Sequence, residues 1–326
     1  MTYYLGIDGG GSKTTCAVGN DTTTLATSTT GPSNVVRVGE AQARESLHLA
    51  IRQACSAAGI TPAQVMQTCM GAAGAARPQI AGIVRRAPAE ILSPPIEVVG
   101  DMHIALEAAF DSGPGVIVNA GTGSFAYGRD AQGNTGRVGG WGFAISDEGS
   151  AHWIGRSAIT AVLRAADEQG TRDHAPSQNS PRLFRALTEA WSVDSLNDLA
   201  AAGNSTPPPE FAALFQPVLA SADAGDELAQ TVLTRASTEL ARLADIAIRR
   251  LFPEAASQAE ASGAASAPDA AVPLAMAGGV FRHASLVRQV FYNEVVELQP
   301  QSKLNPLVVD PVEGALRLAR KPPRLT

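Results

Sequence analysis

Two glycine-rich turns carry the side chains in this sequence that could bind phosphate. The first spans residues 8–13 (DGGGSK), and the second spans residues 119–124 (NAGTGS). Glycine adopts positive φ easily and lets the backbone approach a ligand closely. The N–H groups of such turns form concavities that bind anions. Two turns of this kind indicate a site that holds a chain of phosphates.

The residues after each turn argue against two common nucleotide-binding motifs. A Walker A loop needs a contiguous Gly-Lys-Ser/Thr that opens a helix. Here Ser12 separates Gly11 from Lys13, and the following residues 14–18 favour a strand. Neither turn contains the Gly-x-Gly-x-x-Gly pattern of a Rossmann fold. Each turn is therefore predicted to open a β-hairpin.

Two aspartates lie where strands are predicted to end. Asp101 follows residues 96–99, at the strand end where open α/β sheets place their ligand crevice, and is a candidate general base. It could also cap the helix that begins at Met102. Asp8 could hold Mg²⁺ through water beside the phosphates, or stabilise the hairpin as an Asx turn.

The elements that position these residues form a repeated pattern. Strands over residues 3–8, 14–19 and 24–30 form a meander, which strands over 116–119, 124–128 and 136–138 repeat. Further strands are predicted at 65–70, 96–99 and 274–277, and helices at 40–58, 77–88, 102–110, 283–296 and 311–320. Residues 148–252 are mostly helical, and the Ala/Ser-rich residues 254–271 are predicted to form a flexible surface loop. This duplication predicts a cleft between two halves.

Composition narrows the class of protein. The chain has 326 residues, a net charge of −6 and 3 cysteines, and it shows no basic leader and no long apolar run. The negative charge argues against general binding to nucleic acid or to anionic membranes. The cysteines lack metal-ligand spacing and indicate a reducing, cytoplasmic setting. His103 and His152 are interpreted as helix-surface residues.

The sequence resembles the actin/hexokinase/Hsp70 ATPase superfamily, and more narrowly the N-acetylglucosamine kinase group of BadF/BadG-type ATPases. The motifs that carry the resemblance are residues 7–13, 31–34, 121–124, 139–150 (GGWG, then DEGS) and 277–280. The resemblance implies an α/β fold with two duplicated ribonuclease H-like (actin-like ATPase) domains and a nucleotide/sugar cleft between them. The N-terminal domain is expected over 1–112, completed by the C-terminal helix 311–326, and the second domain over 113–310.

The resemblance also implies an ATP-dependent sugar kinase. It would transfer the γ-phosphate to the 6-hydroxyl of N-acetylglucosamine or a close relative, with Asp101 as the base, ATP and Mg²⁺ as cofactors, and Asp8 holding the metal through water. The residues implied in nucleotide binding are Gly10, Gly11, Ser12, Lys13, Gly121, Thr122, Gly123, Gly278 and Gly279. Those implied in sugar binding are Asn34, Asp101, Ser124, Gly140, Trp141, Gly142, Asp147 and Glu148.

Several of these assignments have a structural alternative. Lys13 could be a solvated strand residue, and Trp141 could be a core residue instead of a pocket wall. Residues 147–150 could cap the helix that starts near 150. Phe125 stands where animal relatives have Asn, which leaves the preferred amino sugar open.

Other functions are also compatible with the fold. A glucosamine kinase is the nearest rival. A BadF-type ATPase activator would need a cysteine-bound iron–sulfur cluster, for which the chain lacks ligands. A sugar-sensing binding protein would not need Asp8, Asp101 and both loops. A homodimer is allowed by the sequence.

Overall fold

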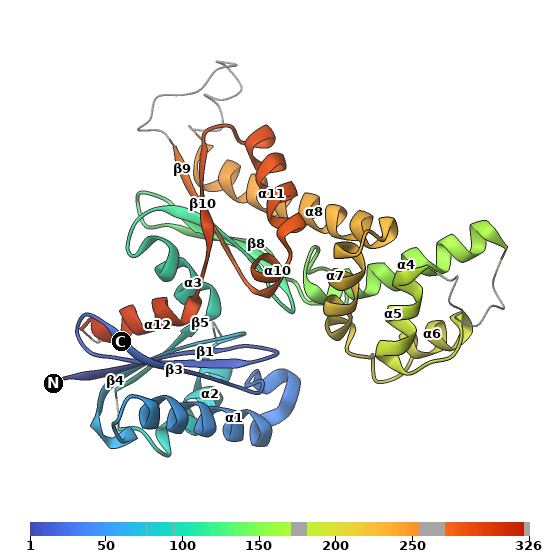
Figure 1. Ribbon diagram of the computed structural model, residues 1–326. Helices are drawn as coiled ribbons and strands as arrows, with labels where there is room; N and C mark the ends of the chain where they lie inside the picture. The colour runs from blue at the N-terminus through green and yellow to red at the C-terminus, as the bar shows by residue number, and fades with distance from the viewer. Residues whose placement is uncertain (76, 94, 171–180, 254–270, 323–326) are drawn as a thin grey trace. The chain divides into compact units, whose positions relative to one another are not determined.

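The computed structural model describes residues 1–75, 77–93, 95–170, 181–253 and 271–322 and divides the chain into two compact units (Figure 1). Unit 1 consists of Met1–Gly115 and Val309–Thr326, and unit 2 consists of Val116–Val308. Each unit is built on one five-stranded sheet. The C-terminal segment thus belongs to the same unit as the N-terminus.

The sheet of unit 1 has the strand order β3-β2-β1-β4-β5. The strands are β1 (Tyr3–Gly9), β2 (Thr14–Gly19), β3 (Thr24–Thr30), β4 (Val65–Ala72) and β5 (Ile96–Gly100). The first three form an antiparallel meander, whereas β4 is parallel to β1 and β5 is parallel to β4. The carboxyl ends of the three parallel strands therefore meet at one edge of the sheet, and Asp8 and Asp101 lie at that edge.

Helices cover both faces of this sheet (Figure 1). Leu5 and Ile7 pack with α1 (Val35–Ala57) and α2 (Pro78–Ala89), whereas the other face carries α3 (Asp101–Phe110) and α12 (Pro311–Arg320). Gly6 faces α12, and a Cβ there would lie 2.4 Å from the backbone nitrogen of Leu316. The C-terminal helix therefore packs directly on the strand that ends in Asp8.

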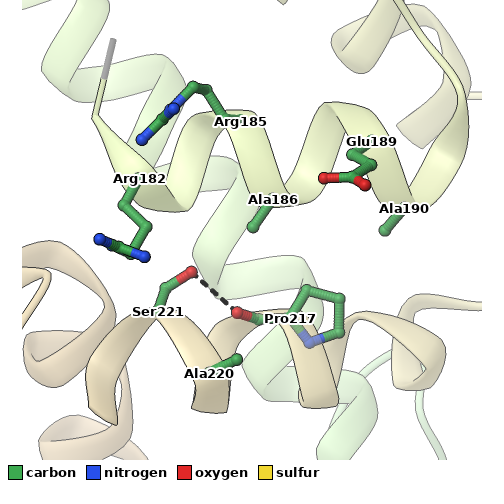
Figure 2. Close-up of a pocket in the computed structure, with 8 residues that line it drawn as sticks. All are labelled: Arg182, Arg185, Ala186, Glu189, Ala190, Pro217, Ala220 and Ser221. Carbon is green, nitrogen blue, oxygen red and sulfur yellow. Dashed lines mark hydrogen bonds between the residues drawn. The ribbon is translucent and has the colours of Figure 1, made fainter. Parts of the chain in front are cut away.

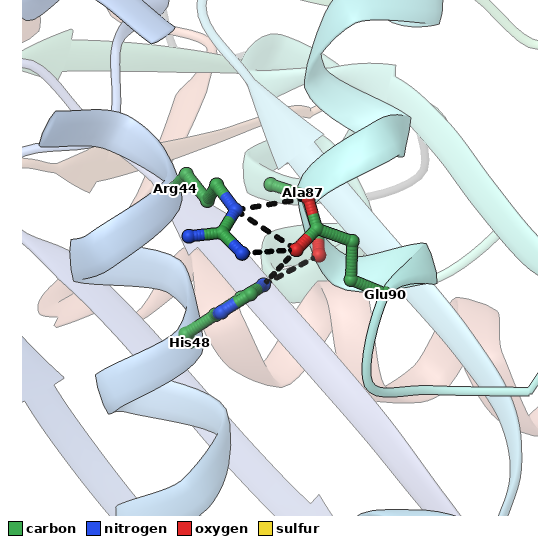
Figure 3. A network of polar contacts seen from close by, with 4 residues as sticks. All are labelled: Arg44, His48, Ala87 and Glu90. Atoms are coloured by element: carbon green, nitrogen blue, oxygen red, sulfur yellow. Dashed lines mark hydrogen bonds and ion pairs between the residues drawn. The ribbon is translucent and has the colours of Figure 1, made fainter. Parts of the chain in front are cut away.

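A polar network joins α1 to α2 (Figure 3). The guanidinium Nε of Arg44 donates to both carboxylate oxygens of Glu90, at 2.9 and 2.8 Å. His48 Nε2 lies 2.8 Å from the carbonyl oxygen of Ala87 and 3.7 Å from Glu90 Oε2. These contacts join α1 to the end of α2, the two helices that pack on the face of the sheet opposite to α3 and α12.

A second ionic network holds the end of α12 on α3. The Lys321 ammonium contacts the buried carboxylate of Glu107 and lies 2.9 Å from Asp111 Oδ1. The guanidinium of Arg317 donates to the carbonyl oxygen of Glu107 at 3.0 Å. The C-terminal helix is thereby tied to the helix that Asp101 begins.

We expect Lys321→Met to lower the free energy of unfolding by about 1–3 kcal/mol, because it leaves the Glu107 carboxylate buried without this partner. Hydrogen bonding to Lys321 lowers the pKa of Asp111 below its ordinary 3.8. Such a group contributes stability above its unfolded pKa and loses it as pH falls through the folded pKa. Urea unfolding should therefore show the wild-type advantage at neutral pH and its decline below about pH 4. An equal difference at pH 7 and pH 3 would contradict this account.

The sheet of unit 2 repeats the strand order of unit 1, as β10-β9-β6-β7-β8. The strands are β6 (Gly115–Ala120), β7 (Ser124–Arg129), β8 (Thr135–Gly139), β9 (Val272–Ala277) and β10 (Ser302–Val309). β9 is parallel to β6, and β7 pairs antiparallel with β8. The correspondence runs strand for strand, so the predicted duplication and the α/β class are confirmed.

The sequence did not predict β10. Pro306 lies inside this strand and Leu307 is 72 % exposed. Proline lacks the N–H that an interior ladder needs and is tolerated on edge strands. β10 is at the edge of its sheet. The edge position explains both the proline and the weak apolar alternation.

The helices of unit 2 build the largest apolar core of the described chain. They are α4 (Ala151–Gln169), α5 (Arg182–Trp191), α6 (Leu196–Gly203), α7 (Phe215–Asp223), α8 (Glu227–Leu251), α10 (Gly279–His283) and α11 (Ser285–Leu298). The helical prediction is confirmed over the described part of 148–252, whereas the loop predicted at 254–271 falls almost wholly outside the described residues. In the described chain, no helix combines the length and apolarity needed to cross a bilayer.

Candidate active site

The glycine-rich turn over residues 8–13, the predicted first phosphate loop, is fixed to the turn that precedes α1. The carbonyl oxygen of Gly10 accepts hydrogen bonds from the N–H groups of Ser33 and Asn34, both at 3.2 Å. The N–H of Gly10 donates to the carbonyl oxygen of Lys13 at 3.0 Å, which closes the loop on itself. The structure thus brings together two predicted motifs, residues 7–13 and 31–34.

Buried hydroxyl groups support this junction. Thr14 Oγ1 lies 2.8 Å from the carbonyl oxygen of Gly31 and 2.8 Å from Ser33 Oγ. Thr14 and Ser33 are fully buried. Neither residue was predicted as a site residue, although Thr14 lies in a predicted strand and Ser33 in the motif over residues 31–34. The two hydroxyl groups hold the loop against the turn over residues 31–34.

Asn34 begins the helix that follows the turn. Its side-chain oxygen accepts a hydrogen bond from the N–H of Val36 at 3.1 Å, as an N-cap residue does. The helix starts at Val35, earlier than the predicted residue 40, but Gly39 interrupts it with a φ of 77°. The predicted start therefore corresponds to the regular part of α1.

Ser12 and Lys13 are exposed at the tip of the first loop. Lys13 directly precedes β2, so its ammonium group is accessible to solvent and to an incoming phosphate alike. Asp8 is half-buried near the end of β1, and both Asp8 and Ser12 make polar contacts. The hydroxyl side chain of Ser12 and the ammonium side chain of Lys13 are thus both exposed on this loop.

Asp101 is the first residue of α3 and follows β5 directly. Its Oδ1 accepts a hydrogen bond from the N–H of Met102 at 3.0 Å. The carboxylate is half-buried and sits at the N-terminus of the helix, where the helix dipole stabilises a negative charge. Asp101 therefore stabilises the helix start, and its position is also compatible with the role of a base.

The glycine-rich turn over residues 119–124, the predicted second phosphate loop, lies against the start of α4 in unit 2. The N–H of Gly121 donates to the carbonyl oxygen of Gly123 at 2.9 Å, and the N–H of Ala151 donates to the carbonyl oxygen of Gly121 at 2.9 Å. Ser124 Oγ donates to the carbonyl oxygen of Glu148 at 2.6 Å. The loop and the segment 147–151 therefore form one hydrogen-bonded substructure.

Asp147 is the centre of this substructure. Its Oδ1 accepts a hydrogen bond from the N–H of Gly142 at 3.3 Å, and a Cβ on Gly123 would lie 2.7 Å from its Oδ2. The residue is 8 % exposed and has a φ of 63°, which is strained for a residue other than glycine. Its carboxylate links the second phosphate loop to the Gly-Trp-Gly segment.

Burial raises the pKa of the Asp147 carboxyl, and the neighbouring charge of Glu148 adds to the increase. Backbone hydrogen bonds from Gly142 and Ser124 act in the opposite direction but are outweighed. A carboxylate that is buried, strained and disfavoured in its charged form costs stability. Perturbed groups of this kind concentrate at functional sites.

The alternative that residues 147–150 cap the following helix is confirmed, and the N-cap residue is Ser150. Its hydroxyl accepts a hydrogen bond from the N–H of Trp153 at 3.1 Å and begins α4. Glu148 is half-buried, and its Oε2 accepts a hydrogen bond from Ser146 Oγ at 3.0 Å. The DEGS segment thus both starts the helix and holds its two carboxylates beside the loop.

Trp141 is 72 % exposed and its ring lies 5.0 Å from the Arg137 guanidinium carbon, which excludes the alternative that it is a core residue. The expectation that His152 is a helix-surface residue is wrong, because this residue is 8 % exposed, with its ring 4.9 Å from Phe143 and 5.1 Å from Phe211.

Gly278 and Gly279 follow β9 in unit 2. Gly278 has a φ of 97°, and a Cβ there would lie 2.3 Å from the carbonyl oxygen of Ala120, so this glycine packs against the end of β6. A Cβ at Gly279 would meet no atom within 4 Å. Gly279 therefore leaves open space beside the strand that leads into the second phosphate loop.

A pocket elsewhere in unit 2 holds none of the predicted site residues. It has a volume of about 520 Å³ and lies between α5 and α7, where Arg182, Arg185 and Glu189 face Pro217 and Ser221 (Figure 2). Ser221 Oγ already donates to the carbonyl oxygen of Pro217 at 2.8 Å. Neither glycine-rich turn lines this pocket.

The donor set around Asp8 fits a magnesium ion that arrives with a nucleotide. Within the described residues, no group of three or more His, Cys, Asp or Glu side chains could hold a metal by itself. Mg²⁺ commonly keeps several waters and is bound through one or two carboxylates together with substrate phosphates. A single carboxylate beside a phosphate loop meets that requirement.

The comparisons with known proteins agree with the family resemblance that the sequence motifs indicate. The model of the BadF/BadG/BcrA/BcrD ATPase family matches residues 5–319. An N-acetylmuramic acid/N-acetylglucosamine kinase of Clostridium acetobutylicum is 29 % identical over 98 % of this chain and 99 % of its own length. An N-acetyl-D-glucosamine kinase of Dictyostelium discoideum is 26 % identical over 97 % of each chain. The similarity therefore spans both units.

The fold has a counterpart among solved structures. A crystal structure assigned as an N-acetylglucosamine kinase, from Chromobacterium violaceum, is 25 % identical, covers 98 % of this chain and 99 % of its own, and has a TM-score of 0.71. The duplicated sheets described above belong to this two-domain architecture.

Proposed function

Because this chain belongs to the BadF/BadG/BcrA/BcrD ATPase family, we propose that it is an ATP-dependent amino-sugar kinase acting on the 6-hydroxyl of N-acetylglucosamine or a close relative. The observation that carries the proposal is the position of the Asp147 carboxylate, which accepts a hydrogen bond from the N–H of Gly142 and would lie 2.7 Å from a Cβ on Gly123. It joins a phosphate loop to the segment that resembles the sugar-binding motif of amino-sugar kinases. A phosphate donor and a sugar acceptor could thus be bound by one substructure.

The chemistry requires phosphate binding, charge neutralisation and removal of a proton from the attacking hydroxyl. The amides of the two glycine-rich loops would bind phosphate oxygens, and Gly278 and Gly279 would border the adenosine. Asp101 would accept the proton of the sugar 6-hydroxyl. Mg²⁺ would neutralise phosphate charge when bound, with Asp8 holding it through water.

The sugar contacts would come from side chains that already have fixed positions. Asn34 begins α1 beside the first loop, and Asp147 and Glu148 lie beside the second. Ser124 and the backbone of Gly140 and Gly142 would add polar contacts, with Trp141 as an exposed ring. Carboxylates and amides can accept and donate to adjacent sugar hydroxyls.

The cysteines weigh against the activator alternative. Cys16, Cys55 and Cys69 are buried, and none of them forms a disulfide within the described residues. Burial raises the pKa of Cys16 well above its ordinary value and that of Cys55 to about 11. Metal clusters need thiolates, which such thiols do not provide near neutral pH. The predicted cytoplasmic location and homodimer stay predictions.

The proposal is tested by measuring ADP release from MgATP with a sugar panel. The panel contains N-acetylglucosamine, N-acetylmuramic acid, glucosamine and glucose. We expect sugar-dependent ADP release that is strongest with an N-acetylated amino sugar. Release without any sugar would favour the activator function, and sugar binding without ADP release would favour a sensor. Product analysis by NMR should place the phosphate on the 6-oxygen.

A further inference from the structure

Thr15 carries a buried hydroxyl that the mechanism above does not use. It is 7 % exposed, and its Oγ1 has no hydrogen-bond partner among the residues that the structure describes. A buried hydroxyl without a partner is unfavourable, and valine would fill the same space in a strand without that cost. Such a hydroxyl suggests a ligand as its partner where a candidate ligand site lies beside it.

The sheet register places Thr15 beside Asp8. The two residues are directly paired across the antiparallel strands β1 and β2. Directly opposed residues in such a pair have their Cβ atoms about 4.5–5.5 Å apart on the same face. Ala17, two residues beyond Thr15, packs with Val312 and Leu316 of α12. Thr15 and Asp8 therefore share the α12 face, near the edge that carries the first phosphate loop.

We propose that Thr15 is a positioning residue whose hydroxyl holds a water through which Asp8 binds the magnesium ion of the nucleotide. This inference rests on the proposed function for the identity of the ligand. When the metal is bound, this water would donate one hydrogen to the Asp8 carboxylate and the other to the hydroxyl oxygen of Thr15. Groups that orient the ligands of a metal typically contribute 10- to 100-fold to metal affinity.

Thr68 provides a matched control in the same sheet. It is fully buried in β4, and its Oγ1 also has no partner in the described chain. It pairs with Leu5, and its neighbour two residues on, Met70, packs in the core under α1. Thr68 therefore points to the opposite face from Asp8. A general effect of removing a buried hydroxyl should appear at both positions.

The test is calorimetric titration of ADP into the 326-residue protein, with Mg²⁺ and with EDTA. We expect Thr15→Val to weaken MgADP binding about 10- to 100-fold while leaving ADP binding in EDTA unchanged. Thr15→Ser, which keeps the hydroxyl, and Thr68→Val should both resemble wild type. Should the valine variants fail to fold, Thr15→Ala and Thr68→Ala replace them.

Three results would overturn the role of Thr15. They are unchanged MgADP affinity in Thr15→Val, an equal loss with and without Mg²⁺, and an equal loss in Thr68→Val. The sugar assay on wild type separates this failure from failure of the proposed function. A protein that binds MgADP but phosphorylates no amino sugar contradicts the function alone, whereas a protein that binds no MgADP contradicts both.

Discussion

Asp101→Asn is expected to lower kcat for sugar phosphorylation by about 10²- to 10⁴-fold, because it removes the acceptor for the hydroxyl proton. The KM values for sugar and ATP should change little. Asparagine keeps an oxygen that can accept the hydrogen bond from the N–H of Met102, so the start of α3 should be preserved. Steady-state kinetics and thermal unfolding of the same preparation measure both effects.

Asp226→Asn is the matched control for this substitution. Asp226 is the N-cap of α8, where it accepts hydrogen bonds from the N–H groups of Ala229 at 3.0 Å and Leu183 at 2.9 Å. It occupies a helix start as Asp101 does, but it has no place in the proposed chemistry. Its variant should keep wild-type kcat. Turnover near wild type in Asp101→Asn, or an equal loss in both variants, would remove Asp101 from the role of base.

The sequence predicted most elements because local patterns and tertiary packing agree there. The strands of the two β-meanders are apolar runs, or alternate apolar and polar residues, between turns rich in Gly, Asn and Asp. The start of α12 is marked by Asp310 and by Pro311, a residue that is common at the first position of a helix. β10 was missed because an edge strand does not need the buried alternation on which such predictions depend. Its identity as a strand is set by pairing with β9, which is distant in the sequence.

The candidate site was predictable as motifs but not as contacts. Ser33, Asn34 and Gly10 were each in a predicted motif, yet no local signal indicated that the amides of the first two bond to the third. The same applies to Gly123 and Asp147, which are brought together by the hairpin β7–β8 between them. His152 was misassigned because its aromatic partners, Phe143 and Phe211, come from separate segments.

Asp147→Asn is expected to separate sugar binding from stability. The variant keeps an oxygen for the N–H of Gly142, and asparagine tolerates the positive φ of this position. It loses the charge that would accept sugar hydroxyls. Hydrogen bonds to charged groups contribute about 1.5–3 kcal/mol. We therefore expect the KM for the sugar to rise about 10- to 150-fold, with the KM for ATP nearly unchanged.

The stability of the same variant should follow from the raised pKa of Asp147. A carboxyl whose pKa is higher in the folded state favours folding in its protonated form, and this contribution is lost as pH rises through the folded pKa. Asparagine is neutral at every pH, so the variant does not lose this contribution to stability at pH 7, whereas the wild type does. Asp147→Asn should therefore unfold at the wild-type temperature or above at pH 7, and the difference should shrink below about pH 4.

Asp130→Asn is the control with the opposite sign. Hydrogen bonding to Asn134 lowers the pKa of Asp130 in the exposed β7–β8 hairpin, so its carboxylate contributes stability above the unfolded pKa and loses it as pH falls. This variant should be less stable at pH 7 and keep the wild-type KM for the sugar. If Asp147→Asn raises the sugar KM without lowering stability at pH 7, the Asp147 carboxylate serves sugar binding and not the stability of the fold. Lower stability together with unchanged sugar KM in Asp147→Asn would instead make Asp147 a structural residue of the loop.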